Sequence, residues 1–311
     1  MAVLEAGKVV GKKVKRPKRG KANAKIGVMP GAMRPVFELR SPVKDKAFDY
    51  IEENRHTKPL LTVAEGTCKG RTLALCGAGP SLRDQRVNGV DHVFACNSAL
   101  TYLYEQGQRV DAGVAIDSTD VMLREWADPP PVHYFLASSV DPALVRHLQA
   151  HDRPVIFFHS YVGFPDELNY YNQKWPPSVM VGRGYNVVER FIHVAEWMGY
   201  DRIDVYGADQ AYAENDITHA NGEVATEAYI TPMIMSGEID GRVWRTRPDM
   251  LMAAVSLVRA VRKYDGKVRL MGDTLPVALL NKDDAFLDLV CRDLTTNKPP
   301  IGADTTNGKQ D

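Results

Sequence analysis

Two glycines, a proline and a serine follow an apolar run in the segment "LALCGAGPSLRD", residues 73–84. Gly77 and Gly79 lack a Cβ atom, so the backbone there can turn sharply and approach a ligand closely. Backbone N–H groups in such a turn can face a phosphate, and Ser81 adds a hydroxyl after Pro80. The third glycine of the dinucleotide fingerprint and the Gly-Lys-Ser/Thr of a Walker loop are both missing. The segment alone therefore fits a phosphate-binding turn and a plain strand–helix connection equally well.

Other small or polar residues stand at the ends of other apolar runs or at the start of a helical segment. In parallel α/β sheets ligands bind at the carboxyl ends of the strands, so such residues gather at one edge. Each also has a structural interpretation, since Asn97 could cap the next helix and Asp117 could accept hydrogen bonds from loop amides. Their joint placement favours a nucleotide site. These residues are Asn97, Ser98, Asp117, Asp120, Gly182, Gly184 and Asp209.

Two side chains are candidates for acid–base chemistry. His219 lies in the polar segment "THANG", ten residues after Asp209. An imidazole or a carboxylate at this position could take a proton from an acceptor hydroxyl. A loop histidine that only makes hydrogen bonds is the alternative for His219. The aromatic segment 160–175 is long for a connection and is predicted to be a lid over an acceptor, with Tyr161, Tyr170 and Tyr171.

The elements that would position these residues alternate between strands and helices. Nearly continuous apolar runs indicate strands buried on both faces, as in a parallel sheet. The predicted strands are Thr72–Cys76, His92–Asn97, Ala112–Asp117, His133–Ala137, Pro154–His159, Arg202–Tyr206 and Lys267–Met271. The predicted helices among them are Ser98–Gln106, Pro142–Ala150, Tyr185–Met198 and Pro248–Lys263. This alternation predicts a doubly wound α/β domain with a mostly parallel, Rossmann-like sheet over residues 71–294.

The segments on either side of this domain differ in composition. Residues 1–25 carry nine Lys or Arg and one acid, Glu5, and are predicted to be a disordered basic tail. The tail could contact an acidic surface such as a nucleic acid, or simply keep the protein soluble. Residues 26–70 read as an irregular leader with one helix near Val43–Arg55, and residues 295–311 as a second disordered tail.

The whole chain has 311 residues, of which 44% are hydrophobic, and its formal net charge is zero. No apolar run reaches the roughly 18–20 residues of a membrane span, and the N-terminal segment has no apolar stretch of a signal peptide. The cysteines, Cys68, Cys76, Cys96 and Cys291, have no metal-ligand spacing. We therefore expect a cytoplasmic protein without a membrane span.

Several motifs, taken together and in order, resemble the MptE-like superfamily. They are "CGAGPSL", "FACNSAL", "RVDAGVAID", "GRGYNVVERFIHVAEWMGYDRIDVYGAD" and "THANG", spread over residues 71–280. That superfamily includes archaeal 6-hydroxymethylpterin diphosphokinases and the Maf-type glycosyltransferases that modify flagellin with nonulosonic acids. Bacterial sialyltransferases that use CMP-sialic acid are similar over the same stretches.

The resemblance implies roles for single positions. The turn Gly77, Gly79, Pro80 and Ser81 would receive the nucleotide phosphates, and Asn97 would contact the nucleotide. Asp117 would face the same pocket, and Gly182 and Gly184 would open the helix beside it. His219 would be the histidine of the Maf-type pattern.

Two departures limit this transfer. The segment "GRVWRTRPDM" lacks the histidine that the sialyltransferases carry before their last long helix, and residues 182–186 lack the acids of the pterin kinases.

Three functions follow as expectations. The first is a nucleotide-dependent glycosyltransferase with a CMP-type sugar donor, His219 or Asp209 as base, and no required cofactor. The second is a Mg²⁺-dependent diphosphokinase that transfers pyrophosphate from ATP, with Asp117 and Asp120 as metal ligands. The third is a non-catalytic nucleotide-binding or assembly protein with the same fold.

Overall fold

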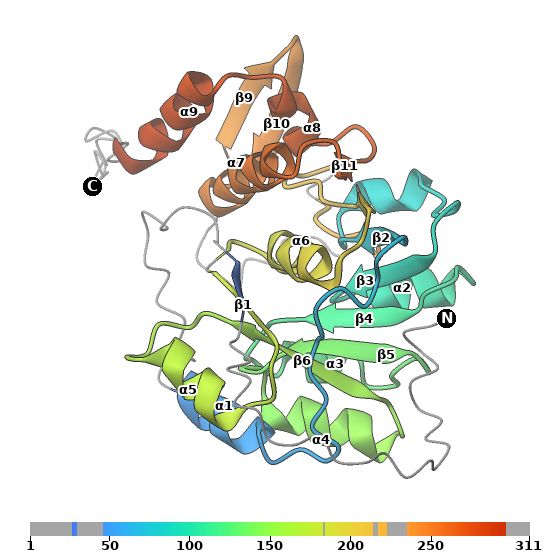
Figure 1. Ribbon diagram of the computed structural model, residues 1–311. Coiled ribbons are helices and arrows are strands. Elements are labelled where there is room, and N and C mark those ends of the chain that lie inside the picture. The colour runs from blue at the N-terminus through green and yellow to red at the C-terminus, as the bar shows by residue number, and fades with distance from the viewer. Residues whose placement is uncertain (1–26, 30–45, 183, 214–216, 223–234, 297–311) are drawn as a thin grey trace, which may run out of the picture.

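The fold is built on one parallel sheet. The computed structural model describes residues 27–29, 46–182, 184–213, 217–222 and 235–296. Its nine-stranded sheet has the order β1-β7-β6-β5-β4-β3-β2-β8-β11, and each pair of neighbouring strands is parallel (Figure 1). The strands are β1 (Gly27–Met29), β2 (Thr72–Cys76), β3 (His92–Cys96), β4 (Ala112–Ala115), β5 (His133–Ala137), β6 (Val155–Ser160), β7 (Val179–Val181), β8 (Arg202–Tyr206) and β11 (Val268–Leu270).

Helices connect the strands and cover the sheet. They are α1 (Ala47–Asn54), the short 3₁₀ helix η3 (Pro80–Asp84), α2 (Ala99–Glu105), α3 (Val121–Glu125), α4 (Pro142–Ala150), α5 (Glu167–Lys174), α6 (Val187–Met198), α7 (Pro248–Lys263), α8 (Leu275–Leu280) and α9 (Asp284–Thr296). Helix α6 packs against β2, β4, β7 and β8, and it lies across the middle of the sheet in Figure 1. Asn186 caps its first turn and Gly199, with a φ of 86°, ends it in the left-handed conformation.

The strand order reverses beside β2. The strands from β3 to β7 follow β2 on one side in chain order, and β1 then pairs with β7. The chain returns through α6, and β8 pairs with the other side of β2. This reversal makes the carboxyl ends of β2 and β8 the topological switch point, where open α/β sheets bind ligands.

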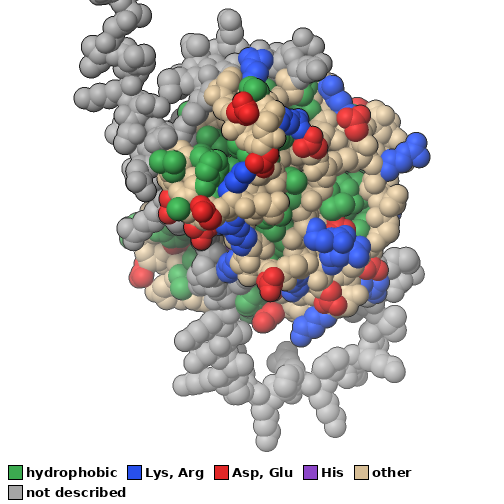
Figure 2. All heavy atoms as spheres, turned by 90° about the horizontal axis from the view of Figure 1, so that it is seen from above, with side chains coloured by type: hydrophobic (Ala, Val, Ile, Leu, Met, Phe, Trp, Pro, Cys, Tyr) green, Lys and Arg blue, Asp and Glu red, His purple; other side chains and the backbone are tan. Residues whose placement is uncertain are grey.

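A smaller unit packs at the β8–β11 end of the sheet. It contains α7, α8, α9 and a hairpin of β9 (Met235–Ile239) and β10 (Arg242–Thr246). A second apolar cluster that includes Trp244 and Leu251 holds it together. Its surface carries ion pairs such as Arg259–Asp288 and Arg262–Asp284. Figure 2 shows basic and acidic side chains mixed over this face, so its described residues form no field of one sign.

The predicted α/β class and the parallel sheet are confirmed. All seven predicted strands are present, with bounds shifted by at most two residues, and so are the five predicted helices. The sequence analysis missed β1, β7 and the β9–β10 hairpin. Helix α9 continues to Thr296, and residues 1–25 and 297–311 of the predicted tails lie outside the described residues.

The predicted lid over residues 160–175 is wrong in part. Residues 167–174 form α5, and the Tyr171 side chain is wholly buried against His159 with ring centroids 3.9 Å apart. The Tyr170 hydroxyl donates to the Glu52 carboxylate of α1. Tyr171 therefore packs α5 against β6, and Tyr170 connects α5 to α1. Both side chains make structural contacts rather than cover a bound acceptor. Among the described residues, no helix has the length and apolar character that crossing a membrane requires.

Candidate functional site

The turns after β2 and β8 are bound to each other through their backbones. The N–H of Gly77 donates to the Tyr206 carbonyl and that of Gly79 to the Gly207 carbonyl, both at 2.8 Å. A Cβ atom on Gly77 would lie 2.6 Å from the Gly207 carbonyl oxygen. The two glycines are thus required by the close approach of two backbones, whatever ligand the turn binds.

The Asp209 side chain closes this junction. Its carboxylate accepts from the backbone N–H of Ser81 at 3.3 Å and from the Ser81 hydroxyl at 2.9 Å. Burial raises the pKa of Asp209 to about 6, although these hydrogen bonds act in the opposite direction. A carboxyl group with such a pKa at a switch point is typical of a functional site.

The segment with His219 is tied to the same turn. The N–H of Ala220 donates to the Ala78 carbonyl at 2.8 Å, and the Arg83 Nε donates to the Ala220 carbonyl at 2.6 Å. The half-buried imidazole of His219 has its Nδ1 atom 2.9 Å from the Thr218 hydroxyl. The structure therefore brings Asp209 and the backbone of the segment that carries His219 to the Gly77–Ser81 turn, while the His219 imidazole contacts Thr218.

Asn97 lies at the end of the neighbouring strand β3 in a left-handed conformation, with a φ of 51°. Its N–H donates to the Val114 carbonyl, but its buried Oδ1 atom has no hydrogen-bond partner among the described residues. Ser98 is the N-cap residue of α2 and its side chain makes no capping bond. The side chain of Asn97 therefore does not cap α2, and its buried Oδ1 atom is a polar group that the described residues leave unsatisfied.

The acids after β4 contact neighbours within their own loop and helix turn. Asp117 accepts from the N–H and the hydroxyl of Thr119, at 2.8 and 2.7 Å. Asp120 is exposed and pairs with Arg124 one turn along α3. Within the described part of the chain, no three acidic, histidine or cysteine side chains cluster with the geometry of a metal site. The two aspartates each have a protein partner of their own in this arrangement.

The loop after β7 is held by the first turn of α6. Gly182 directly follows β7, and the carbonyl of Gly184 accepts from the Arg190 guanidinium at 2.9 Å. Arg190 also donates to the Ser160 hydroxyl at the end of β6, at 2.6 Å. A Cβ on Gly77 would lie 3.1 Å from a methyl group of Val188. The first turn of α6 therefore connects the β7 loop to the Gly77–Ser81 turn across the sheet.

Glu189 is a buried residue of this turn that the sequence analysis missed. Its carboxyl group is fully buried, and it accepts from the Tyr185 N–H at 3.0 Å and from the Ser256 hydroxyl of α7 at 2.7 Å. Burial raises its pKa above the ordinary value. The pattern Asn186-x-x-Glu189 could have indicated it, because a capping residue followed by Glu three positions later marks a helix start.

We expect Glu189→Ala to lower the free energy of unfolding by about 1–2 kcal/mol, because it leaves the buried Ser256 hydroxyl and the half-buried Tyr185 N–H without an acceptor. Glu189→Gln should cost less than about half of that, since an amide can accept from the Tyr185 N–H and donate to the Ser256 hydroxyl. Urea denaturation of both variants at pH 7 measures the difference. Equal losses would show that the ionised carboxylate itself is needed.

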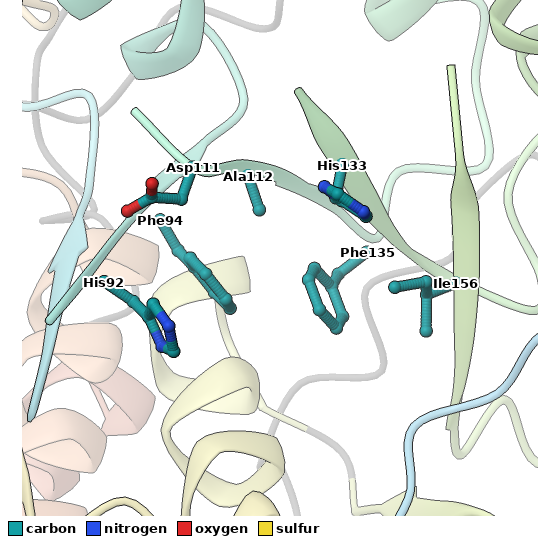
Figure 3. A pocket seen from close by; sticks show the side chains of 7 residues that line it. All are labelled: His92, Phe94, Asp111, Ala112, His133, Phe135 and Ile156. Carbon is teal, nitrogen blue, oxygen red and sulfur yellow. The ribbon is translucent and has the colours of Figure 1, made fainter. Parts of the chain in front are cut away.

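A separate hollow lies at the opposite, amino edge of the sheet. Figure 3 shows its lining, in which Ala112 leaves a gap between His92 and His133 above the rings of Phe94 and Phe135. The hollow has room for about one water molecule. The Asp111 carboxylate accepts from the Val93 N–H at 2.8 Å and pairs with Arg109. The hollow is therefore too small for a nucleotide and lies at the other edge from the residues above.

Comparison with known proteins identifies the family of this chain. The family model described as "6-hydroxymethylpterin diphosphokinase MptE-like" matches residues 46–215, which include β2 to β8 and the Ser81–Asp209 contact. The chain belongs to the MptE-like family. No curated protein matches it.

Two solved structures are similar to this member of the MptE-like family. The Maf glycosyltransferase from Magnetospirillum magneticum AMB-1 is 12% identical with a TM-score of 0.49, over 81% of this chain and 42% of that chain. The present chain thus spans less than half of that protein. A mammalian sialyltransferase is 13% identical with a TM-score of 0.32, over 73% of this chain and 85% of that chain. At these values neither structure bears on the chemistry of this chain.

Proposed function

We propose that this MptE-like protein is a nucleotide-dependent transferase that moves a glycosyl group from a CMP-type sugar donor to an acceptor hydroxyl. The observation that carries the proposal is the contact of the Asp209 carboxylate with Ser81 at the switch point, where the segment with the second candidate base, His219, is bound to the same turn through Ala220. In the proposed site, Ser81 and the backbone beside it bind the donor phosphate, and Asn97 at the end of β3 contacts the nucleotide.

The proposed reaction is a displacement at the anomeric carbon. The acceptor oxygen forms a bond to this carbon as the bond between carbon and phosphate oxygen breaks, and the nucleotide leaves with that electron pair. The acceptor proton passes to Asp209 or His219. A carboxyl group with a pKa near 6 suits this role, since it is ionised at neutral pH and still basic enough to take a proton.

A second candidate function is pyrophosphoryl transfer from ATP to a pterin or a similar small alcohol. It is favoured by the family match, whose description names 6-hydroxymethylpterin diphosphokinase. It is disfavoured because the two carboxylates that would hold Mg²⁺ are already engaged, Asp117 by Thr119 and Asp120 by Arg124.

The test begins with ligand-induced changes in thermal stability. The protein is heated with CMP, CDP, UDP, GDP, ATP or GTP, each with and without Mg²⁺, because a ligand that binds only the folded state raises Tm. We expect a metal-independent rise with CMP. The rise should be smaller in Ser81→Ala and persist unchanged in Ser236→Ala, which alters an exposed serine of β9.

A second measurement separates the three functions. Release of CMP from CMP-sialic acid by the wild-type protein, and its loss in Asp209→Asn, would support glycosyl transfer. A Tm rise only with ATP or GTP plus Mg²⁺ would overturn it in favour of pyrophosphoryl transfer. Nucleotide binding without any product would indicate a non-catalytic member of the family.

A further inference from the structure

The donors of the Gly77–Ser81 turn are largely in use in the protein without ligand. The N–H groups of Gly77 and Gly79 donate to the backbone carbonyls of Tyr206 and Gly207. The N–H and hydroxyl of Ser81 donate to Asp209 instead. The carbonyls are fixed parts of the β2–β8 junction, whereas the carboxylate is on a side chain that can rotate away. A ligand can therefore replace Asp209 as the acceptor for the N–H and hydroxyl of Ser81, but it cannot replace the carbonyls that bind Gly77 and Gly79.

The position of the Asp209 carboxylate is the one that an anion would take. Its Oδ2 atom lies so close to Gly79 that a Cβ on this glycine would be 2.1 Å from it. The carboxylate thus lies directly against a glycine Cα and accepts from the adjacent serine, as phosphate oxygens do in glycine-containing turns. We propose that Asp209 occupies the phosphate position in the free protein and that the donor phosphate displaces it from Ser81.

Displacement would leave the surrounding backbone in place. The carbonyl of Asp209 accepts from the Leu275 N–H at the start of α8, at 3.3 Å, and the neighbouring Gln210 carbonyl accepts from the Thr246 hydroxyl of β10, at 2.7 Å. These contacts hold the main chain after β8 while the side chain changes its rotamer. Arg242 of β10 supplies a positive charge that acts on the carboxylate.

This inference rests on the proposed function and adds an order of events to it. Before the donor binds, the carboxylate accepts from Ser81 and is not available to an acceptor hydroxyl. The donor phosphate takes over the Ser81 N–H and hydroxyl, and the released carboxylate can then receive the acceptor proton. The protein would therefore bind donor before it can deprotonate an acceptor.

Calorimetric titration with CMP measures the competition directly. An amide accepts weaker hydrogen bonds than a carboxylate, so Asp209→Asn should bind CMP about tenfold more tightly than the wild type. Asp209→Ala should do so as well, and Ser81→Ala should bind more weakly because it removes a donor. Asp84→Asn, an exposed acid three residues after Ser81, is the control for loss of one negative charge and should stay within about twofold.

The competing outcomes are distinct. Weaker or unchanged binding in both Asp209 variants would overturn the inference, because the carboxylate would then contact the ligand or never leave Ser81. The same titrations with inorganic pyrophosphate, read by NMR at the Ser81 amide, do not depend on the nucleotide. If pyrophosphate follows the predicted order and CMP does not bind, only the proposed function fails. If neither binds any of the proteins, both fail.

Discussion

Replacing Asp209 by asparagine should stabilise the folded protein at pH 7.5, by about 1–3 kcal/mol. Burial raises the pKa of Asp209 to about 6, so the folded protein holds this proton more tightly than the unfolded chain does. Between the unfolded pKa, near 4, and pH 6, the unfolded chain has lost the proton while the folded protein still binds it. Stability contributed by this group is therefore present below pH 4 and is lost as the pH rises through 6, a loss of roughly 3 kcal/mol at most.

Asparagine does not ionise in this pH range, so the difference in stability between the variant and the wild type should depend on pH. It should be largest above pH 6.5 and shrink as the pH falls toward 4. Urea denaturation at half-unit intervals from pH 4.5 to 8 measures it. A gain in stability at a polar site, together with a loss of product formation, would mark Asp209 as a residue retained for function. A destabilised Asp209→Asn would instead assign the carboxylate a structural role.

Asp91 is a control whose contribution to folding stability should depend on pH in the opposite direction. Hydrogen bonds from the N–H and the hydroxyl of Thr72 lower the pKa of Asp91. Its ionised form therefore stabilises the folded state above the unfolded pKa, and this contribution is lost as the pH falls through the folded pKa. Asp91→Asn should destabilise the protein at neutral pH, with a loss that shrinks in acid. If the stability differences of the Asp91 and Asp209 variants from the wild type changed with pH in the same direction, the opposite pKa shifts assigned to these two residues would be contradicted.

The strands that consist of a continuous apolar run could be predicted from the sequence alone. The runs at 72–76, 92–96 and 133–137 are apolar along most of their length, and such runs are typical of strands covered on both faces. Strand β7 has only three residues, too few for a pattern to stand out. The β9–β10 hairpin did carry a signal, since Asp240 and Gly241, both with positive φ, form the Asp-Gly pair of a tight turn.

The residues of the candidate site could be predicted from the sequence, but the contacts between them could not. Strand ends pointed to Gly77, Asn97, Asp117 and Asp209, because parallel strands end at a common edge. The contact of Ser81 with Asp209 joins residues 128 positions apart. It exists because β8 pairs with β2, and no local pattern contains that strand order.

Substitution of Gly77 should cause the second large change in stability, because two backbone segments are in close contact at this position. We expect Gly77→Ala to lower the free energy of unfolding by about 3 kcal/mol, at the upper end of the usual cost of overpacking. The added Cβ would lie 2.6 Å from the Gly207 carbonyl oxygen and 3.1 Å from a Val188 methyl group. To make room, the ends of β2 and β8 would have to separate, which weakens the hydrogen bond from the Gly77 N–H to the Tyr206 carbonyl.

Gly237→Ala is the matched control, since Gly237 lies in β9 without positive φ and a Cβ there would meet no atom of the described residues within 4 Å. It should change stability by less than about 0.5 kcal/mol. Urea denaturation of the two variants side by side isolates the cost of close approach from the general cost of replacing glycine. If Gly77→Ala is as mild as the control, the two turns can separate without loss. In that case the junction of β2 and β8 is not the rigid support that the site at the switch point requires.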